Sequence, residues 1–249
     1  MGCSRSQLAE TIHTQLNITF PSTNMPGTLG EVIAKIKDRL GDKMEADGIA
    51  IDLLQRKKGR ERQNPDYQAP WEIIYQWLWE IEFPRRGWEL AKETATYAKE
   101  ELQMIDSNKV DRDLVFNVPN PTIHKGEKYA LEVNFLHEGH LLLINQGVSG
   151  NLYCLCPSLG FSPETQVMPD KKLYIPSIKA LAPCLEYNTT GNEYFLAILT
   201  ENPVKLSWVN PDSDPSYMLL TDERLREIFQ EVGRQWNALV FSKKFEVVE

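Results

Sequence analysis

Cysteine and histidine are scarce in this chain of 249 residues, which contains four of each. No apolar run approaches the roughly 18–20 residues that a membrane-spanning helix needs. No hydrophobic segment of the signal-peptide type precedes the cysteines, so we expect a cytoplasmic protein with reduced thiols and no membrane span. The P-loop, the dinucleotide-binding glycine pattern and the serine-hydrolase elbow are also missing. These absences count against the commonest nucleotide-binding and hydrolase classes.

Charge is the next constraint. The net charge is −8, while the hydrophobic fraction of 42% and the charged fraction of 25% are ordinary for a globular protein. The main basic cluster consists of Arg56, Lys57, Lys58, Arg60 and Arg62. Five positive charges so close together could contact phosphates, which makes a nucleic-acid-associated regulator one alternative function. The acidic remainder of the chain favours a solvated loop instead.

Helical patterns dominate the first 108 residues. Apolar residues in 28–40 recur at the spacing of one helical face, and residues 70–82 are almost entirely apolar apart from a polar stripe at every fourth position. Pro84 is expected to end that second helix. A third helix is predicted over 86–105, where the spacing between successive apolar residues alternates between three and four positions. We therefore predict an N-terminal helical bundle that serves as an interaction domain, residues 1–108.

After residue 108 the pattern changes to short strands. The segment 108–121 carries Asn-Pro and Val-Pro turns, which makes it the best candidate for a domain boundary. Strands are predicted over 127–135, 140–145, 151–156, 172–175, 180–187 and 193–200, followed by a helix over 222–236 and a closing strand over 238–248. The turn that contains Gly147 and Gly150 predicts that the strands 140–145 and 151–156 form a hairpin. The fold class is therefore α+β. Residues 109–249 are expected to form an antiparallel β-sandwich-like domain with a C-terminal helix.

One group of residues has the chemistry of a metal site. His137, His140, Cys154 and Cys156 together offer two nitrogens and two sulfurs, the ligand set of structural zinc. A zinc- or thiol-dependent hydrolase is therefore a further alternative. However, cysteines at alternate positions of a strand share one face and are usually small core residues. We therefore assign no catalytic, metal-binding or cofactor-binding residue.

Four segments occur in an order that resembles a known family. They are residues 140–145, 150–157, 172–176 and 191–199. The span 126–205 is similar to the domain of unknown function 4384 family, uncharacterised β domains common in cyanobacteria and other bacteria. Members are often attached to caspase-like peptidases, protein kinases or other signalling modules. The resemblance implies a β domain that accompanies such an enzyme and assigns no active-site residue.

These observations predict a non-enzymatic module for protein–protein interaction and regulation, with a signalling or defence enzyme as its partner. The helical part would supply the contact. Trp71 and Trp79 are the predicted apolar anchors, and the basic cluster at residues 56–62 would steer the association by charge.

Overall fold

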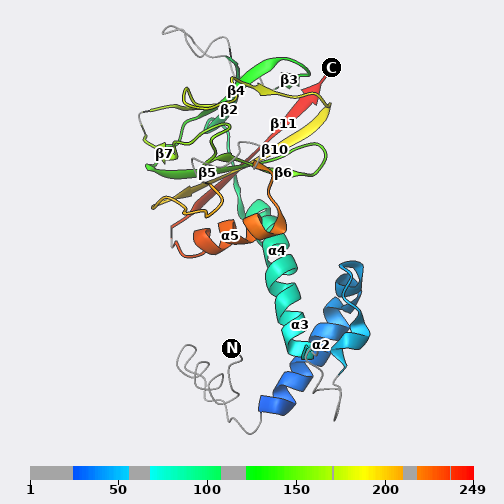
Figure 1. Cartoon of the computed structure of the whole chain (residues 1–249). Coiled ribbons are helices and arrows are strands. Elements are labelled where there is room, and N and C mark those ends of the chain that lie inside the picture. Colours follow the sequence, from blue (N-terminus) through cyan, green and yellow to red (C-terminus); the bar gives the residue numbers. More distant parts are fainter. Residues whose placement is uncertain (1–24, 56–67, 108–121, 170, 210–217, 236) are drawn as a thin grey trace. The chain divides into compact units, whose positions relative to one another are not determined.

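The computed structural model describes residues 25–55, 68–107, 122–169, 171–209, 218–235 and 237–249. The chain divides into two compact units, Met1–Glu82 (unit 1) and Phe83–Glu249 (unit 2), and Figure 1 labels the main elements of each. This division falls earlier than the predicted boundary between residues 108 and 109. The reason is that the segment after Glu82 packs with the β strands rather than with the preceding helices.

The secondary structure in the described residues of unit 1 is all helical. It contains α2 (Met25–Ala46), the 3-10 helix η1 (Ile51–Leu54), α3 (Pro70–Trp77) and the π-helical turn η3 (Leu78–Glu82). Its core forms around Met44, Leu54, Ile73, Ile74 and Trp77. The helices predicted over 28–40 and 70–82 are thus present. The predicted N-terminal helical bundle is not confirmed by the described part of this unit.

The helix predicted over 86–105 is present only in its first half. The helix α4 (Phe83–Thr94) follows the π-helical turn η3 without a break, so Pro84 does not end the helical segment. The irregular backbone hydrogen bonding of a π-helical turn next to the proline accommodates its missing N–H. The helix then ends at Thr94, whose hydroxyl donates to the Leu90 carbonyl at 2.8 Å, and residues 102–106 form a strand instead.

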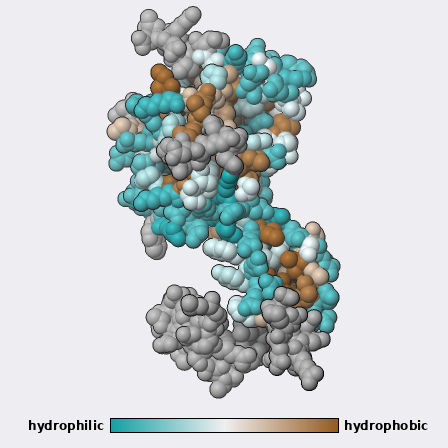
Figure 2. Space-filling view, in the orientation of Figure 1, coloured by the Kyte–Doolittle hydropathy of each residue, from teal (hydrophilic) through white to brown (hydrophobic). Residues whose placement is uncertain are grey.

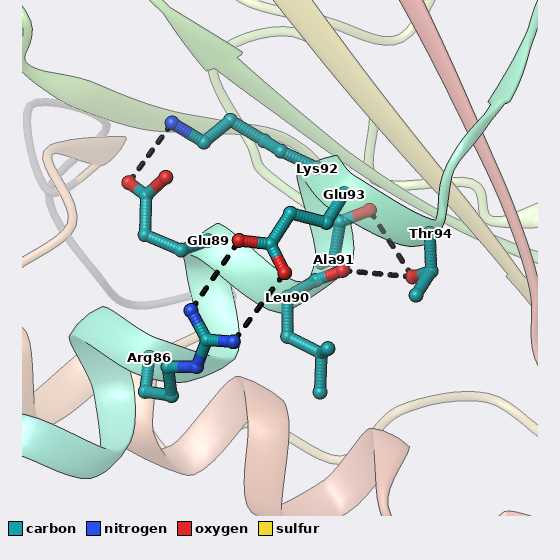
Figure 3. Close-up of polar contacts among 7 residues, drawn as sticks. All are labelled: Arg86, Glu89, Leu90, Ala91, Lys92, Glu93 and Thr94. Atoms are coloured by element: carbon teal, nitrogen blue, oxygen red, sulfur yellow. Dashed lines mark hydrogen bonds and ion pairs between the residues drawn. The ribbon is translucent and has the colours of Figure 1, made fainter.

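Figure 3 shows the polar contacts on α4. Arg86 and Glu93 form an ion pair at 3.3 Å, and Lys92 pairs with Glu89 at 2.9 Å. These charged side chains leave Trp88 and Ala91 as the buried face of the helix. The helix is therefore amphipathic, and it packs by its apolar face.

Unit 2 contains two β-sheets (Figure 1). Sheet A is seven-stranded and consists of β1 (Thr96–Tyr97), β3 (Thr122–His124), β5 (Gly139–Gln146), β6 (Leu152–Cys156), β7 (Gln166–Val167), β10 (Gly191–Thr200) and β11 (Leu239–Val248). Sheet B is four-stranded and consists of β2 (Leu102–Asp106), β4 (Lys128–Val133), β8 (Leu173–Ile175) and β9 (Leu185–Glu186). The central strands of sheet A, β11-β10-β5-β6, are antiparallel, whereas β1 and β3 join β11 in parallel.

Sheet A is buried on both faces. On one face, Leu141 and Leu143 of β5 belong to a core shared with sheet B, which we call the inter-sheet core. On the other face, Leu142 and Ile144 belong to a second core with α4 and α5 (Asp222–Val232), which we call the helix-side core. Double burial explains why β5 and β10 are continuous apolar runs rather than alternating ones.

The sequence predicted the mixed α and β composition and most of these strands. The strands near 127–135, 140–145, 151–156, 172–175 and 193–200, the helix near 222–236 and the final strand near 238–248 are all present, although α5 is shorter because Gly233 caps it. The strand predicted over 180–187 is reduced to β9. Strands β5 and β6 form the predicted antiparallel hairpin.

Candidate binding sites

The predicted partner-binding residues fall into two groups. Arg56, Lys57, Lys58, Arg60 and Arg62 lie outside the described residues. Trp71 lies on α3 and is 45% exposed, whereas Trp79 in the η3 turn is half-buried. Of these two tryptophans, Trp71 is therefore the well-exposed one.

Helix α3 buries one face and exposes aromatic side chains elsewhere. It begins after Ala69, whose N–H donates to the Glu72 carboxylate at 2.8 Å, and Pro70 occupies the first helical position. Tyr75 is 62% exposed and lies one turn from Trp71. We call Trp71 and Tyr75 the α3 surface. Figure 2 shows apolar residues reaching the surface of unit 1 among hydrophilic ones.

The possible zinc ligands do not form one cluster. The two cysteines were predicted to share a face, but this prediction is wrong: Cys154 lies in the helix-side core and Cys156 in the inter-sheet core. The cause is a register shift in the β5–β6 pairing, between Leu143 and Ile144. One extra residue of β6 lies at this irregularity, so the side chains on its two sides no longer alternate between the faces of the sheet in the regular way.

The histidines do not complete a site either. His137 is exposed, and the His140 ring contacts the Thr165 hydroxyl at 2.9 Å. Within the described ranges, no group of three or more histidine, cysteine and acidic side chains could hold a metal ion.

The two buried thiols are poor nucleophiles. Burial raises the pKa of Cys156 to about 12, and burial raises the pKa of Cys154 well above its ordinary value. Because the thiolate is the reactive species, these side chains remain as inert thiols at neutral pH.

A pocket in unit 2 combines a buried carboxylate with apolar walls. It has a volume of about 470 Å³ and is lined by residues from the 145–161 and 185–193 segments and by Met218. Inward-facing positions of β5 and β10 carry apolar side chains such as Leu143 and Phe195. At one end of these two strands the inward-facing positions are polar instead: Asn145 on β5 and Glu193 on β10 lie on the same face of sheet A as Leu143 and Phe195. We call this the Glu193 pocket.

Two hydrogen bonds hold the Glu193 carboxylate. Asn145 donates from Nδ2 to Oε2 at 2.9 Å, and the Val148 N–H donates to Oε1 at 3.2 Å. Glu193 is only 6% exposed, and among the described residues no lysine or arginine pairs with it. Burial raises the pKa of Glu193, and the two hydrogen bonds only partly oppose that effect. The site is therefore a desolvated carboxylate that has no counter-ion among the residues that the structure describes.

Tyr187 lies in the same pocket. Burial raises the pKa of its phenol well above the ordinary value, and the nearby charge of Glu193 raises it further. The tyrosine hydroxyl therefore stays protonated next to the carboxylate. It can donate a hydrogen bond but does not supply a charge.

Sequence analysis missed the Glu193 pocket, although a signal was present. Glu193 and Asn145 are strongly polar residues at positions whose alternation places them inside, which is unusual unless they are paired or functional. Recognising the site also required the pairing of β5 with β10, and these strands are separated by almost fifty residues.

Comparison with known proteins does not assign the chain to a family. No family model, no curated protein and no solved structure matches this chain. The similarity of residues 126–205 to a family of bacterial β domains therefore stays a prediction. In the described part of the chain, none of the helices has the length and apolar character to cross a membrane.

Proposed function

We propose that this protein is a non-enzymatic module for protein–protein interaction and regulation. The helical unit contacts a protein partner, and the β-sandwich-like unit serves as its sensing part. The proposed partner is a cytoplasmic signalling or defence enzyme, such as a caspase-like peptidase or a kinase, the kind of protein that the resemblance of residues 126–205 implies.

The α3 surface carries this proposal. Trp71 and Tyr75 remain exposed although α3 buries Ile73, Ile74 and Trp77 to form the core of unit 1. Folding of the described residues therefore leaves these two rings available. Tryptophan and tyrosine are enriched at binding hot spots, where truncation of one anchor costs about 2 kcal/mol or more.

A capture experiment tests the proposal. The full chain is used as bait in lysate from its native source, and the captured protein is identified and quantified. The Trp71→Ala, Tyr75→Ala double variant should lose that same protein by more than about tenfold, because two anchors are removed.

A control variant keeps this test specific. Leu90→Ala with Tyr97→Ala removes two exposed apolar side chains of unit 2, which are 49% and 59% exposed. This variant should capture the partner at the wild-type level. Equal capture by the α3 double variant, or equal loss in the control, would refute the role of the α3 surface.

A further inference from the structure

The charges around the Glu193 pocket select the sign of its ligand. Among the described residues that line it, the charged ones are Glu186 and Glu193, and both are acidic. An anionic ligand would meet these carboxylates without a compensating lysine or arginine. A cation, by contrast, would supply the counter-ion that the buried carboxylate of Glu193 lacks.

The remaining lining selects an organic cation over a metal ion. Tyr153, Phe161 and Tyr187 contribute aromatic rings, and Leu155, Leu185 and Met218 contribute apolar surface. Ca²⁺ needs about six to eight oxygen ligands, and Mg²⁺ needs an octahedral set. An ammonium group needs only a few hydrogen-bond acceptors and gains from nearby aromatic rings, and its hydrocarbon stem matches the apolar walls.

We propose that the Glu193 pocket binds an organic ammonium ion: a primary amine on a short apolar stem, which donates hydrogen bonds to the Glu193 carboxylate. The stem lies against the aromatic and apolar lining. The ammonium group belongs either to a free amine or to a lysine side chain of a peptide. This site is separate from the α3 surface, so its failure would leave the proposed protein contact untouched.

Gly147 shows where the ligand would approach. A Cβ at this position would lie 3.7 Å and 3.8 Å from the two carboxylate oxygens of Glu193, and 3.8 Å from Cε2 of Tyr153. The space in front of Gly147 is therefore shared by the carboxylate and an aromatic ring. A methyl group fits there at ordinary van der Waals distance, so Gly147→Ala should fold normally while it fills part of the proposed ammonium site.

The direct test is a titration of the full chain with butylammonium chloride at neutral pH. Phosphate buffer is used because amine buffers would compete. The readout is the NMR shift of the Val148 amide, whose N–H donates to Glu193. The shift should saturate with butylammonium, and 1-butanol, the neutral analogue, should bind at least about tenfold more weakly. Tetramethylammonium has the charge but no N–H donor, so it should also bind more weakly than butylammonium.

Three variants locate the site. Glu193→Gln and Gly147→Ala should each weaken butylammonium binding by about tenfold or more. Glu186→Gln is the matched control: it removes an exposed, solvent-screened carboxylate from the same pocket and should change binding by less than about threefold.

The source of the amine is decided by a parallel titration with Nα-acetyl-lysine methylamide. Binding at least as tight as that of butylammonium would support a peptide lysine, and weaker binding would support a free amine. The proposal would be overturned if no saturable shift occurred, if 1-butanol bound as well as butylammonium, or if Glu193→Gln and Gly147→Ala both left binding unchanged.

Discussion

At Gly87, α4 packs against α5 without room for a side chain. A Cβ at Gly87 would lie 2.7 Å from Cδ2 and 2.9 Å from Cγ of Phe229. Carbon atoms in good contact are about 3.5–4.0 Å apart, so the added methyl would overlap the ring by roughly 1 Å. Cγ is the first ring atom, close to the backbone, so the ring cannot easily move away.

Gly87→Ala therefore combines two opposing effects. Replacing glycine by alanine inside a helix adds about 1 kcal/mol of stability, whereas overpacking a filled site costs about 1–3 kcal/mol. We expect a net loss of about 1 kcal/mol in the free energy of unfolding of unit 2. Gly30→Ala is the control for helix propensity, measured on the unfolding of unit 1: a Cβ at Gly30 of α2 meets nothing within 4 Å, so this variant should show the helix-propensity gain alone.

Urea unfolding followed by circular dichroism and tryptophan fluorescence measures these changes. A double-mutant cycle with Phe229→Ala isolates the clash: once the ring is gone, Gly87→Ala should become stabilising, with a coupling of about 1–2 kcal/mol. If Gly87→Ala stabilised the wild-type protein as much as Gly30→Ala does, the packing of α4 on α5 described above would be refuted.

Three further predictions test other parts of the structure. The raised pKa of Glu193 means that wild-type stability falls as pH rises from the ordinary value of 4.5 through the folded-state pKa. The urea midpoint of Glu193→Gln should therefore rise relative to that of the wild type over that window, and a pH-independent difference would contradict the raised pKa. Cys154 and Cys156 should react with a thiol reagent only as fast as the protein opens, while the half-buried Cys184 reacts faster; peptide mapping that finds rapid labelling of Cys156 in folded protein would contradict its burial. Leu142→Ala and Leu143→Ala should each cost about 2–5 kcal/mol, because these neighbours face opposite filled cores; a loss below about 1 kcal/mol at either site in chemical denaturation would mean that one face of sheet A is not packed.

The strands of unit 2 were predictable because their signals are local. Alternating polarity identified β4, and the turn around Gly150 identified the β5–β6 hairpin. Gly150 adopts a positive φ of 85°, which favours glycine at such a turn. The final strand and α5 were likewise evident from their own periodicity.

The end of α4 was not predictable in this way. The apolar residues of 86–105 fit a helical period, yet Leu102 and Met104 lie in the inter-sheet core as part of β2. Strand β2 pairs with β4, about thirty residues away in the chain, and that pairing overrides the local helical pattern. The sequence of β2 or of β4 taken alone does not reveal this pairing.

Of the two candidate sites, one has a local signal in the sequence and the other depends on residues that are distant in the chain. Trp71 was predicted to be an anchor because it lies in an unusually apolar helix; its side chain is exposed, and the anchor role stays a prediction. The Glu193 pocket depends instead on three parts of the chain that are distant in sequence, so its residues acquire a common role only when 145–161, 185–193 and Met218 come together.

Site-specific photocrosslinking at Tyr75 tests the central claim, that the α3 surface contacts a protein partner, most directly. A photoreactive p-benzoylphenylalanine is introduced at position 75, and in a second sample at position 97, which is similarly exposed in unit 2. The account predicts a covalent adduct with the captured protein from position 75 and none from position 97. No adduct from position 75, or equal adducts from both positions, would contradict it.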